Sequence, residues 1–233
     1  GDNGVNLTLE NGSFIESSSI QFDESNVGSS LRFKSGSELR ISNLSNAKMT
    51  FDKGSRIFLY TSKQESEEIR NGDANKSIDQ VINDVTLGNN ANTVTLTGVV
   101  EMNDVDIYTR VNLKDNLGDH IVVDGDKGLL KGTGATLHLR NTGSLEVDSI
   151  NRSIRFFTGK LADGFVWKVA NPLEVGAYIY DTTLSQTKDN KGITRVTFNL
   201  QEKRRRKAKL TSTAMGFMEN TYADYFQELG TVD

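Results

Sequence analysis

A repeat in the first sixty residues limits the fold more than any other feature of this chain. Segment 31–41, LRFKSGSELRI, is followed eighteen positions later by segment 49–59, MTFDKGSRIFL. The alignment pairs Phe33 with Phe51, Gly36 with Gly54, Ser37 with Ser55, Leu39 with Ile57, and Ile41 with Leu59. Because turns fall on turns and apolar residues on apolar residues, the two segments are copies of one structural unit.

The repeated unit is made of short strands. Six segments alternate apolar and polar side chains, which directs the apolar ones to one face. They are 7–9, 20–22, 31–33, 39–41, 49–51 and 57–59. Short strands and glycine turns with a period of about twenty residues are typical of a β-solenoid, whose stacked coils bury one another's apolar rows. A β-sandwich of irregular hairpins is the alternative.

The composition of the chain agrees with thin coils and excludes several classes of protein. Only 36% of the residues are hydrophobic, there are 21 glycines, and Pro172 is the single proline. This is too polar for one large globular core. The absence of cysteine excludes disulfides and a thiol nucleophile. A net charge of -4 gives no support to nucleic-acid binding.

Two further features concern how the coils are interrupted and where the chain comes from. Residues 61–84 are highly charged and poor in strand formers, so we expect an inserted loop there. Such a loop is either a binding feature or a solvated connection. The chain starts with GDNG, without Met, and contains no signal peptide and no stretch of about 20 apolar residues. We interpret it as a piece of a longer protein.

The strands become longer and more aromatic toward the C-terminus. The segments concerned are 155–157, 165–169, 177–180 and 195–200. A solenoid must close its open end against edge-to-edge association, and aromatic side chains bury the most area. We therefore predict an aromatic C-terminal cap, with Trp167 as a core residue of this cap and not as a platform for a ligand.

Four motifs in residues 118–200 carry a resemblance to a known family. They are GDHIVVDGD, GTGATLHLRNTGS, VGAYIYD and ITRVTFNL, in this order. Together they resemble the autochaperone segment of pertactin-type autotransporter passenger domains. The family often ends its closing strand with Trp and Leu, where this chain has Phe198 and Leu200. The resemblance implies a right-handed parallel β-helix in residues 1–115, with the inserted loop at 61–84, and an autochaperone-like cap in 116–200.

The same resemblance implies a function and a location. The function implied is that of an autotransporter passenger domain. Such a domain passes through the outer membrane by way of its own translocator barrel and is then secreted or displayed on the bacterial cell surface. We expect a monomeric virulence factor that binds a host cell-surface protein or glycan, as an adhesin or a receptor-directed effector. One alternative is a structural stalk and folding nucleus, with the binding region upstream. Another is a polysaccharide-active β-helix enzyme.

Residues 201–233 are expected to form a basic linker and a short trailing α-helix. Met215, Met218, Tyr222, Phe226 and Leu229 recur at helical spacing within 211–229. The basic run before this helix consists of Lys203, Arg204, Arg205, Arg206, Lys207 and Lys209. It is either a linker and processing site or a surface that binds polyanions.

The sequence contains no recognisable motif of catalysis. His120 and His138 lie in predicted strands, with no nucleophile motif beside them. Asp119, Asp124 and Asp126 do not follow the order of a calcium-binding loop, and Asp and Gly in such a segment usually form turns. We therefore predict no enzyme activity, no cofactor and no metal site.

Overall fold

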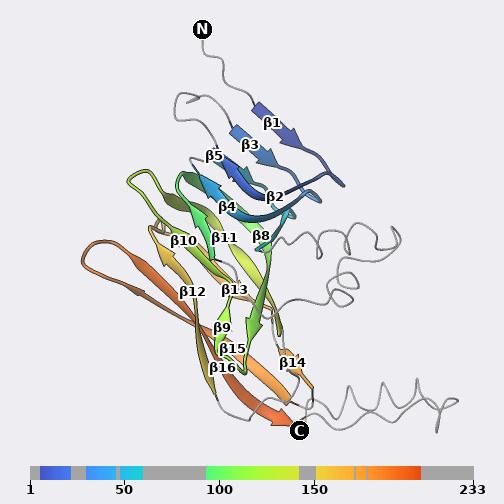
Figure 1. Cartoon of the computed structure of the whole chain (residues 1–233), viewed down its shortest axis with the longest axis vertical. Helices are drawn as coiled ribbons and strands as arrows, with labels where there is room; N and C mark the ends of the chain where they lie inside the picture. The colour runs from blue at the N-terminus through green and yellow to red at the C-terminus, as the bar shows by residue number, and fades with distance from the viewer. Residues whose placement is uncertain are drawn as a thin grey trace, which may run out of the picture.

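The computed structural model describes residues 6–21, 30–45, 48–59, 93–141, 151–170, 172–176 and 178–205 (Figure 1). This part of the chain contains β-strands and no helix, which confirms the all-β class. The strands are β1 (Asn6–Leu9), β2 (Phe14–Gln21), β3 (Ser30–Phe33), β4 (Glu38–Ser45), β5 (Lys48–Phe51), β6 (Arg56–Phe58), β7 (Thr93–Leu96), β8 (Val99–Asn112), β9 (Leu117–Gly118), β10 (His120–Val123), β11 (Leu129–Asn141), β12 (Arg152–Gly159), β13 (Val166–Val169), β14 (Leu173–Val175), β15 (Tyr178–Lys188) and β16 (Thr194–Arg205).

Most of these strands belong to three parallel ladders. The first ladder joins β1, β3, β5 and the beginnings of β8 and β11. The second joins the beginnings of β2 and β4 to β6, the middle of β8, β11 and β13. The third joins the ends of β2 and β4 to β7, β10 and β12. The chain visits the ladders in the same order on every pass, so the strands curl around a shared interior (Figure 1).

The register between β3 and β5 confirms the repeat that the sequence predicts. Leu31 pairs with Met49, and Phe33 pairs with Phe51. On the second ladder, Leu39 pairs with Ile57. The Phe33 and Phe51 rings stack inside the coil, with centroids 4.6 Å apart. An offset of eighteen residues therefore brings like side chains into contact.

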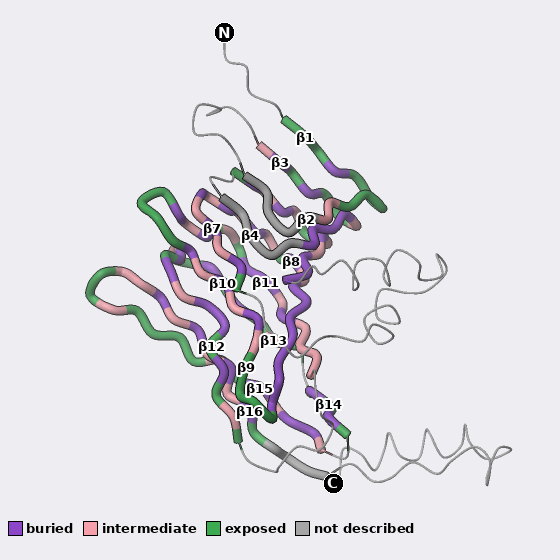
Figure 2. The backbone as a smooth tube through the Cα atoms, viewed as in Figure 1, coloured by how far each residue is buried: buried purple, intermediate pink, exposed green. Residues whose placement is uncertain are grey.

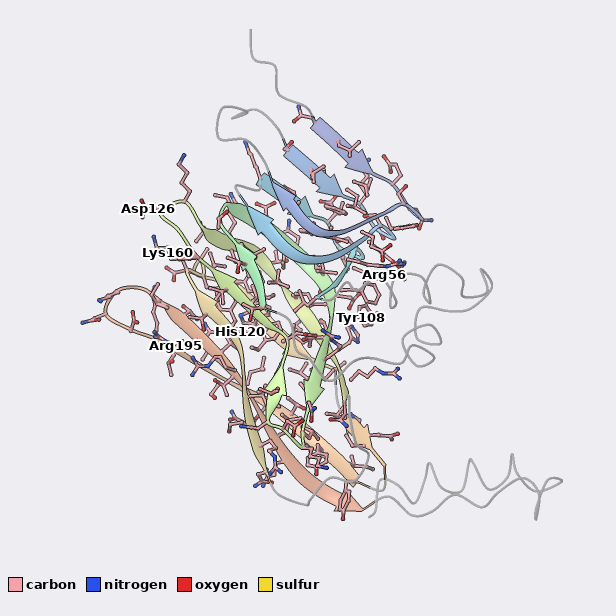
Figure 3. All side chains as sticks on the ribbon, viewed as in Figure 1. Arg56, Tyr108, His120, Asp126, Lys160 and Arg195 are labelled. Carbon is pink, nitrogen blue, oxygen red and sulfur yellow. The ribbon has the colours of Figure 1, made fainter. Side chains whose placement is uncertain are left out.

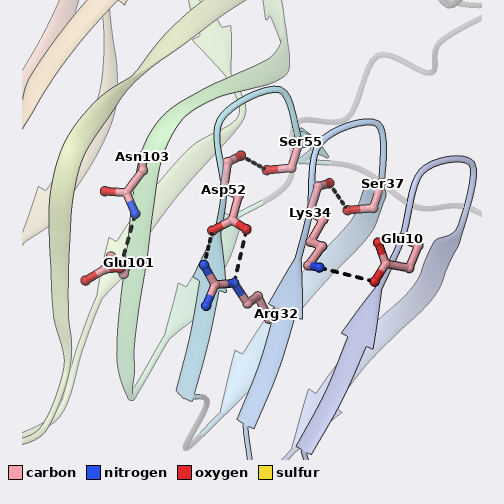
Figure 4. Close-up of polar contacts among 8 residues, drawn as sticks. All are labelled: Glu10, Arg32, Lys34, Ser37, Asp52, Ser55, Glu101 and Asn103. Atoms are coloured by element: carbon pink, nitrogen blue, oxygen red, sulfur yellow. Dashed lines mark hydrogen bonds and ion pairs between the residues drawn. The ribbon is translucent and has the colours of Figure 1, made fainter.

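The turns between the first and second ladders stack in the same way (Figure 4). Gly36 and Gly54 have φ of 79° and 84°, a region that suits glycine. The Gly36 N–H donates to the Gly54 carbonyl at 2.9 Å. The hydroxyl of Ser37 donates to the Lys34 carbonyl at 2.6 Å. Ser55 repeats this bond with the Asp52 carbonyl at 2.7 Å, so both buried hydroxyls are satisfied inside their own turns.

The inward side chains form continuous apolar columns. Leu39, Ile57, Ile107 and Leu137 are in register on the second ladder, and all four are buried. Figure 2 shows this burial as purple segments along the strands. Each such side chain contributes about 1.5–3 kcal/mol on burial, so the thin coils depend on their neighbours for most of their stability.

The direction of the strands changes after β12. β12 is parallel to β10 on one side and antiparallel to β16 on the other. β15 and β16 form a long antiparallel pair, and β14 pairs antiparallel with β15. Parallel stacking thus continues past residue 116 and through β13, and the antiparallel strands lie beyond it.

An aromatic cluster fills the space beneath these antiparallel strands. Trp167 contacts the rings of Phe156, Phe157 and Phe165, with centroids 5.3, 5.4 and 4.7 Å away. Phe156 also contacts Phe198 of β16 at 4.9 Å. Trp167 is 8% exposed, which confirms the prediction that it is a core residue.

Gly54→Ala tests the stacking of the turns. An alanine Cβ at this position meets the Ser35 hydroxyl, and φ is also unfavourable. We expect a loss of about 2–3 kcal/mol in the free energy of unfolding, measured with urea. Gly12→Ala is the matched control because Gly12 has φ of 84° but no atom within 4 Å of its Cβ position. It should lose only about 1 kcal/mol; equal losses would contradict the stacking.

Trp167→Ala tests the aromatic cluster. Removal of the buried ring should lower the free energy of unfolding by about 3–5 kcal/mol. The neighbouring Val166 is 51% exposed, so Val166→Ala should change it by no more than about 0.5 kcal/mol. Limited proteolysis should show that the tryptophan variant is cleaved first near the C-terminal strands. Similar stability and cleavage of the two variants would count against a cluster held by Trp167.

Candidate functional site

Planar side chains stack along the outer face of the second ladder. Arg40, Phe58, Tyr108 and His138 are in register on β4, β6, β8 and β11. Phe58 and Tyr108 stack at 4.8 Å, and Tyr108 and His138 at 4.6 Å. The Arg40 guanidinium lies 5.8 Å from the Phe58 centroid and 4.8 Å from that of Phe14. We call these five residues the outer stack.

The outer stack follows from strand alternation and in-register pairing. Leu39 and Ile57 point inward, so Arg40 and Phe58, the next residues, point outward. Neighbouring strands lie about 4.8 Å apart, a separation that suits planar groups stacked in register. A cation over an aromatic face adds attraction, which suits Arg40 between two phenylalanines.

Charged residues lie beside the outer stack on the same strands. Glu38 accepts a hydrogen bond from Nη2 of Arg40 through Oε2 and one from Nη2 of Arg56 through Oε1, each at 2.9 Å. Glu38 is 8% and Arg40 7% exposed. Asp106 pairs with Arg56 in the register, and its Oδ1 lies 2.8 Å from Nε2 of His138. Figure 3 shows Arg56 and Tyr108 close together, with Asp126 on the opposite side of the view.

The carboxylates of Glu38 and Asp106 on this face are each paired with a basic side chain. Glu38 faces Arg40 and Arg56, and Asp106 faces His138. Nε and Nη1 of Arg40 and Nε of Arg56 are buried, with no hydrogen-bond partner among the described residues. The groups of this face that a ligand can reach are the partly exposed side chains of Asp106 and His138, which suit ligands rich in hydrogen-bonding groups.

The two histidines lie in strands, as predicted, but on different ladders. His138 belongs to the outer stack on β11. His120 lies on β10, with Nε2 3.1 Å from the Thr158 hydroxyl. Burial lowers the pKa of His120 below its ordinary value, and the positive charge of Arg155 lowers it further. The two imidazoles therefore lie on different ladders and have different contact partners.

The three aspartates named in the sequence analysis have different roles. Asp119 is fully buried and accepts two bonds at 3.0 Å from the Arg110 guanidinium, together with the Arg110 backbone N–H at 2.8 Å. Asp124 and Asp126 are exposed at the turn after β10, where Asp124 accepts the Gly125 N–H. In the described ranges, no group of three or more His, Asp or Glu side chains is placed to hold a metal ion.

Only part of the basic run lies within the structure. Lys203, Arg204 and Arg205 belong to β16, where Arg204 pairs with Ile179 and Arg205 with Tyr178 of β15. The closing strand is thus longer than the sequence pattern indicates. Arg206, Lys207 and Lys209 lie outside the described residues, as do the insertion at 61–84 and the helix predicted in 211–229. Within the described part, no helix is long and apolar enough to cross a membrane.

The outer stack is not predicted from the sequence. One signal was present in the repeat, because the same offset of eighteen aligns Glu38 with Arg56 and Arg40 with Phe58 at outward positions. Tyr108 and His138 gave no such signal, since the offset from β6 to β8 differs from that of the repeat.

Glu38→Gln tests whether one carboxylate holds both arginines. It leaves the buried Arg40 guanidinium and the partly buried Arg56 guanidinium without their shared counter-charge, so we expect a loss of about 3 kcal/mol in the free energy of unfolding. Asp52→Asn is the control because its partner Arg32 is exposed on the outer face of the first ladder, and it should lose less than about 1 kcal/mol. Comparable losses in urea unfolding would show that the charge at Glu38 is dispensable.

Comparison with known proteins adds no assignment. No protein-family model matches the chain, and no curated protein matches it. The geometry described above and the four motifs in residues 118–200 are therefore the basis for a function.

Proposed function

We propose that the chain is part of an autotransporter passenger, secreted or displayed on the bacterial surface, that binds a host cell-surface protein or glycan. In this proposal the coils form a right-handed parallel β-helix, and the antiparallel strands after β12 are its autochaperone-like cap. The observation that carries the proposal is the change from parallel to antiparallel pairing within the region of the four resembling motifs.

The positions of the motifs support this reading. The first motif contains β10, and the second contains most of β11, both of which belong to parallel ladders. The third enters β15 and the fourth enters β16, the long antiparallel pair. The motifs thus span the transition from coil to cap, where a protein that folds from one end needs its most stable unit.

A folding role for the cap has a physical basis. β15 and β16 are joined by a short turn, in which Asp189 accepts the N–H groups of Lys191 and Ile193 at 2.9 and 3.0 Å. Contacts between strands that are near in sequence form faster than the long-range pairing of parallel coils. The cap therefore offers a template onto which coils add one after another.

The outer stack is the surface that best fits the binding role. Asp106 and His138 keep partly exposed polar edges beside buried aromatic rings. Sugars are bound largely through hydrogen bonds to such polar groups. We therefore assign glycan contact to this face of the second ladder, with the cap and inner columns as support.

Binding of the purified chain to cultured host cells tests the proposal. We expect saturable binding, and we expect Arg56→Ala with His138→Ala to weaken it at least tenfold. Arg32→Ala with Lys131→Ala is the control on the first ladder, and it should bind normally. Each variant must be shown to be folded at the assay temperature, because a loss of folding would also abolish binding.

Three outcomes would overturn parts of this proposal. An absence of saturable binding to any host cell or glycan would favour the stalk and folding nucleus alone. Release of reducing ends from a polysaccharide by the unmodified chain would favour the enzyme. Normal binding by the Arg56 and His138 variant would remove the outer stack from the binding surface.

A further inference from the structure

The first coil of the described structure leaves the apolar interior open at one end. Leu7, Leu31, Met49 and Val100 are in register on the first ladder and form one inward column. The last three are buried, whereas Leu7 is 48% exposed. Figure 2 shows the change from green at β1 to purple at the later strands. Among the described residues, the column thus ends at Leu7, which pairs with Leu31 on one side only.

The stacked turns end in the same way. The side chain of Asn11 occupies the space over Gly36, and that of Ser35 occupies the space over Gly54. The Gly12 N–H donates to the Gly36 carbonyl at 3.0 Å, which continues the bond from Gly36 to Gly54. Yet no atom lies within 4 Å of the Cβ position of Gly12. The space over Gly12 therefore corresponds to the filled spaces over Gly36 and Gly54, but it is open.

The outer stack also ends at the first described coil. The Arg40 guanidinium lies against one face of Phe14, and this phenylalanine is 47% exposed. Phe58, which lies between Arg40 and Tyr108, is buried. Among the described strands, β1 pairs with β3 alone and β2 with β4 alone. The inward column, the turn and the outer stack all end at the same coil.

Exposed sheet edges in soluble proteins usually carry lysine, proline or a bulge that blocks the addition of a strand. Residues 6–21 contain no Lys, Arg or Pro. Among the described strands, the edge of β1 and β2 is unpaired on one side, has exposed apolar residues, and carries Glu10 and Glu16 as its only charged side chains. These features favour an edge that binds polypeptide.

We propose that this edge is an interaction surface for one further polypeptide coil, stacked in parallel on β1 and β2. The partner coil places an apolar side chain over Leu7, a small polar side chain over Gly12 and a planar one over Phe14. The same contacts recur between each described coil and the next, so the surface continues an interface already present. A second copy of the chain facing this edge across a two-fold axis would run antiparallel, and its turn would not match the site over Gly12.

An extended chain tests this surface. A copy of residues 30–47 is joined in front of Gly1, and a scrambled extension of the same composition serves as the control. Amide hydrogen exchange of residues 6–9 is then followed by mass spectrometry. We expect the matching coil to slow this exchange at least tenfold relative to the scrambled one. Equal exchange in the two proteins would overturn the proposal.

Gly12→Ala sharpens the test because its Cβ would occupy the site that the added turn needs. In the matching extension it should remove most of the protection of residues 6–9. Exchange in β5 and β8 should stay unchanged, which shows that the variant is folded. Full protection despite Gly12→Ala would overturn the proposed stacking. Protection that appears in the unextended chain as its concentration rises would overturn it in favour of a second copy.

Discussion

In-register parallel pairing is the interaction on which the rest of this structure depends. Each coil hydrogen-bonds to the next at the same positions, so one inward residue lies over another and one turn over another. Phe33 on Phe51 is the consequence inside the coil, and Phe58 on Tyr108 is the consequence outside. No coil has a core of its own, because its apolar row is covered by the coils on either side.

This dependence explains which parts of the structure could be predicted from the sequence. The offset between Phe33 and Phe51 could be read because both strand and turn recur in one short stretch, and the register is confirmed. Trp167 was identified as a core residue because a large ring near a closing end has few other uses. By contrast, burial of Glu38 and Arg40 contradicts the ordinary preference of charged residues for the surface, and only their pairing explains it. The partner of Arg110 was missed for a similar reason, since Asp119 lies in a stretch that reads as a turn.

Because each coil is covered by its neighbours, the first and last described coils each have one side that no further described coil covers, and the two ends of the structure differ in how they treat it. At one end, β16 runs against β12 and stops the parallel ladder, and Phe198 seals the aromatic cluster beneath it. At the other end, Leu7 and Phe14 hold the positions of stacked residues but are 48% and 47% exposed. The two ends of this stack of coils therefore differ, because antiparallel strands close one of them and the apolar positions of the first described coil stay exposed at the other. The proposed function makes use of this difference, because a capped end can fold first and support all the others.

The outer stack also constrains how such a sequence can evolve. Tyr108 has one face on Phe58 and the other on His138, although the three residues are far apart in the chain. A substitution that removes the planar ring at one of these positions leaves bare surface on its neighbours, so compensation must come from strands on either side. Sequences that share this fold should consequently show covariation along whole columns, and an aromatic residue lost in one coil should be accompanied by changes in the coils next to it.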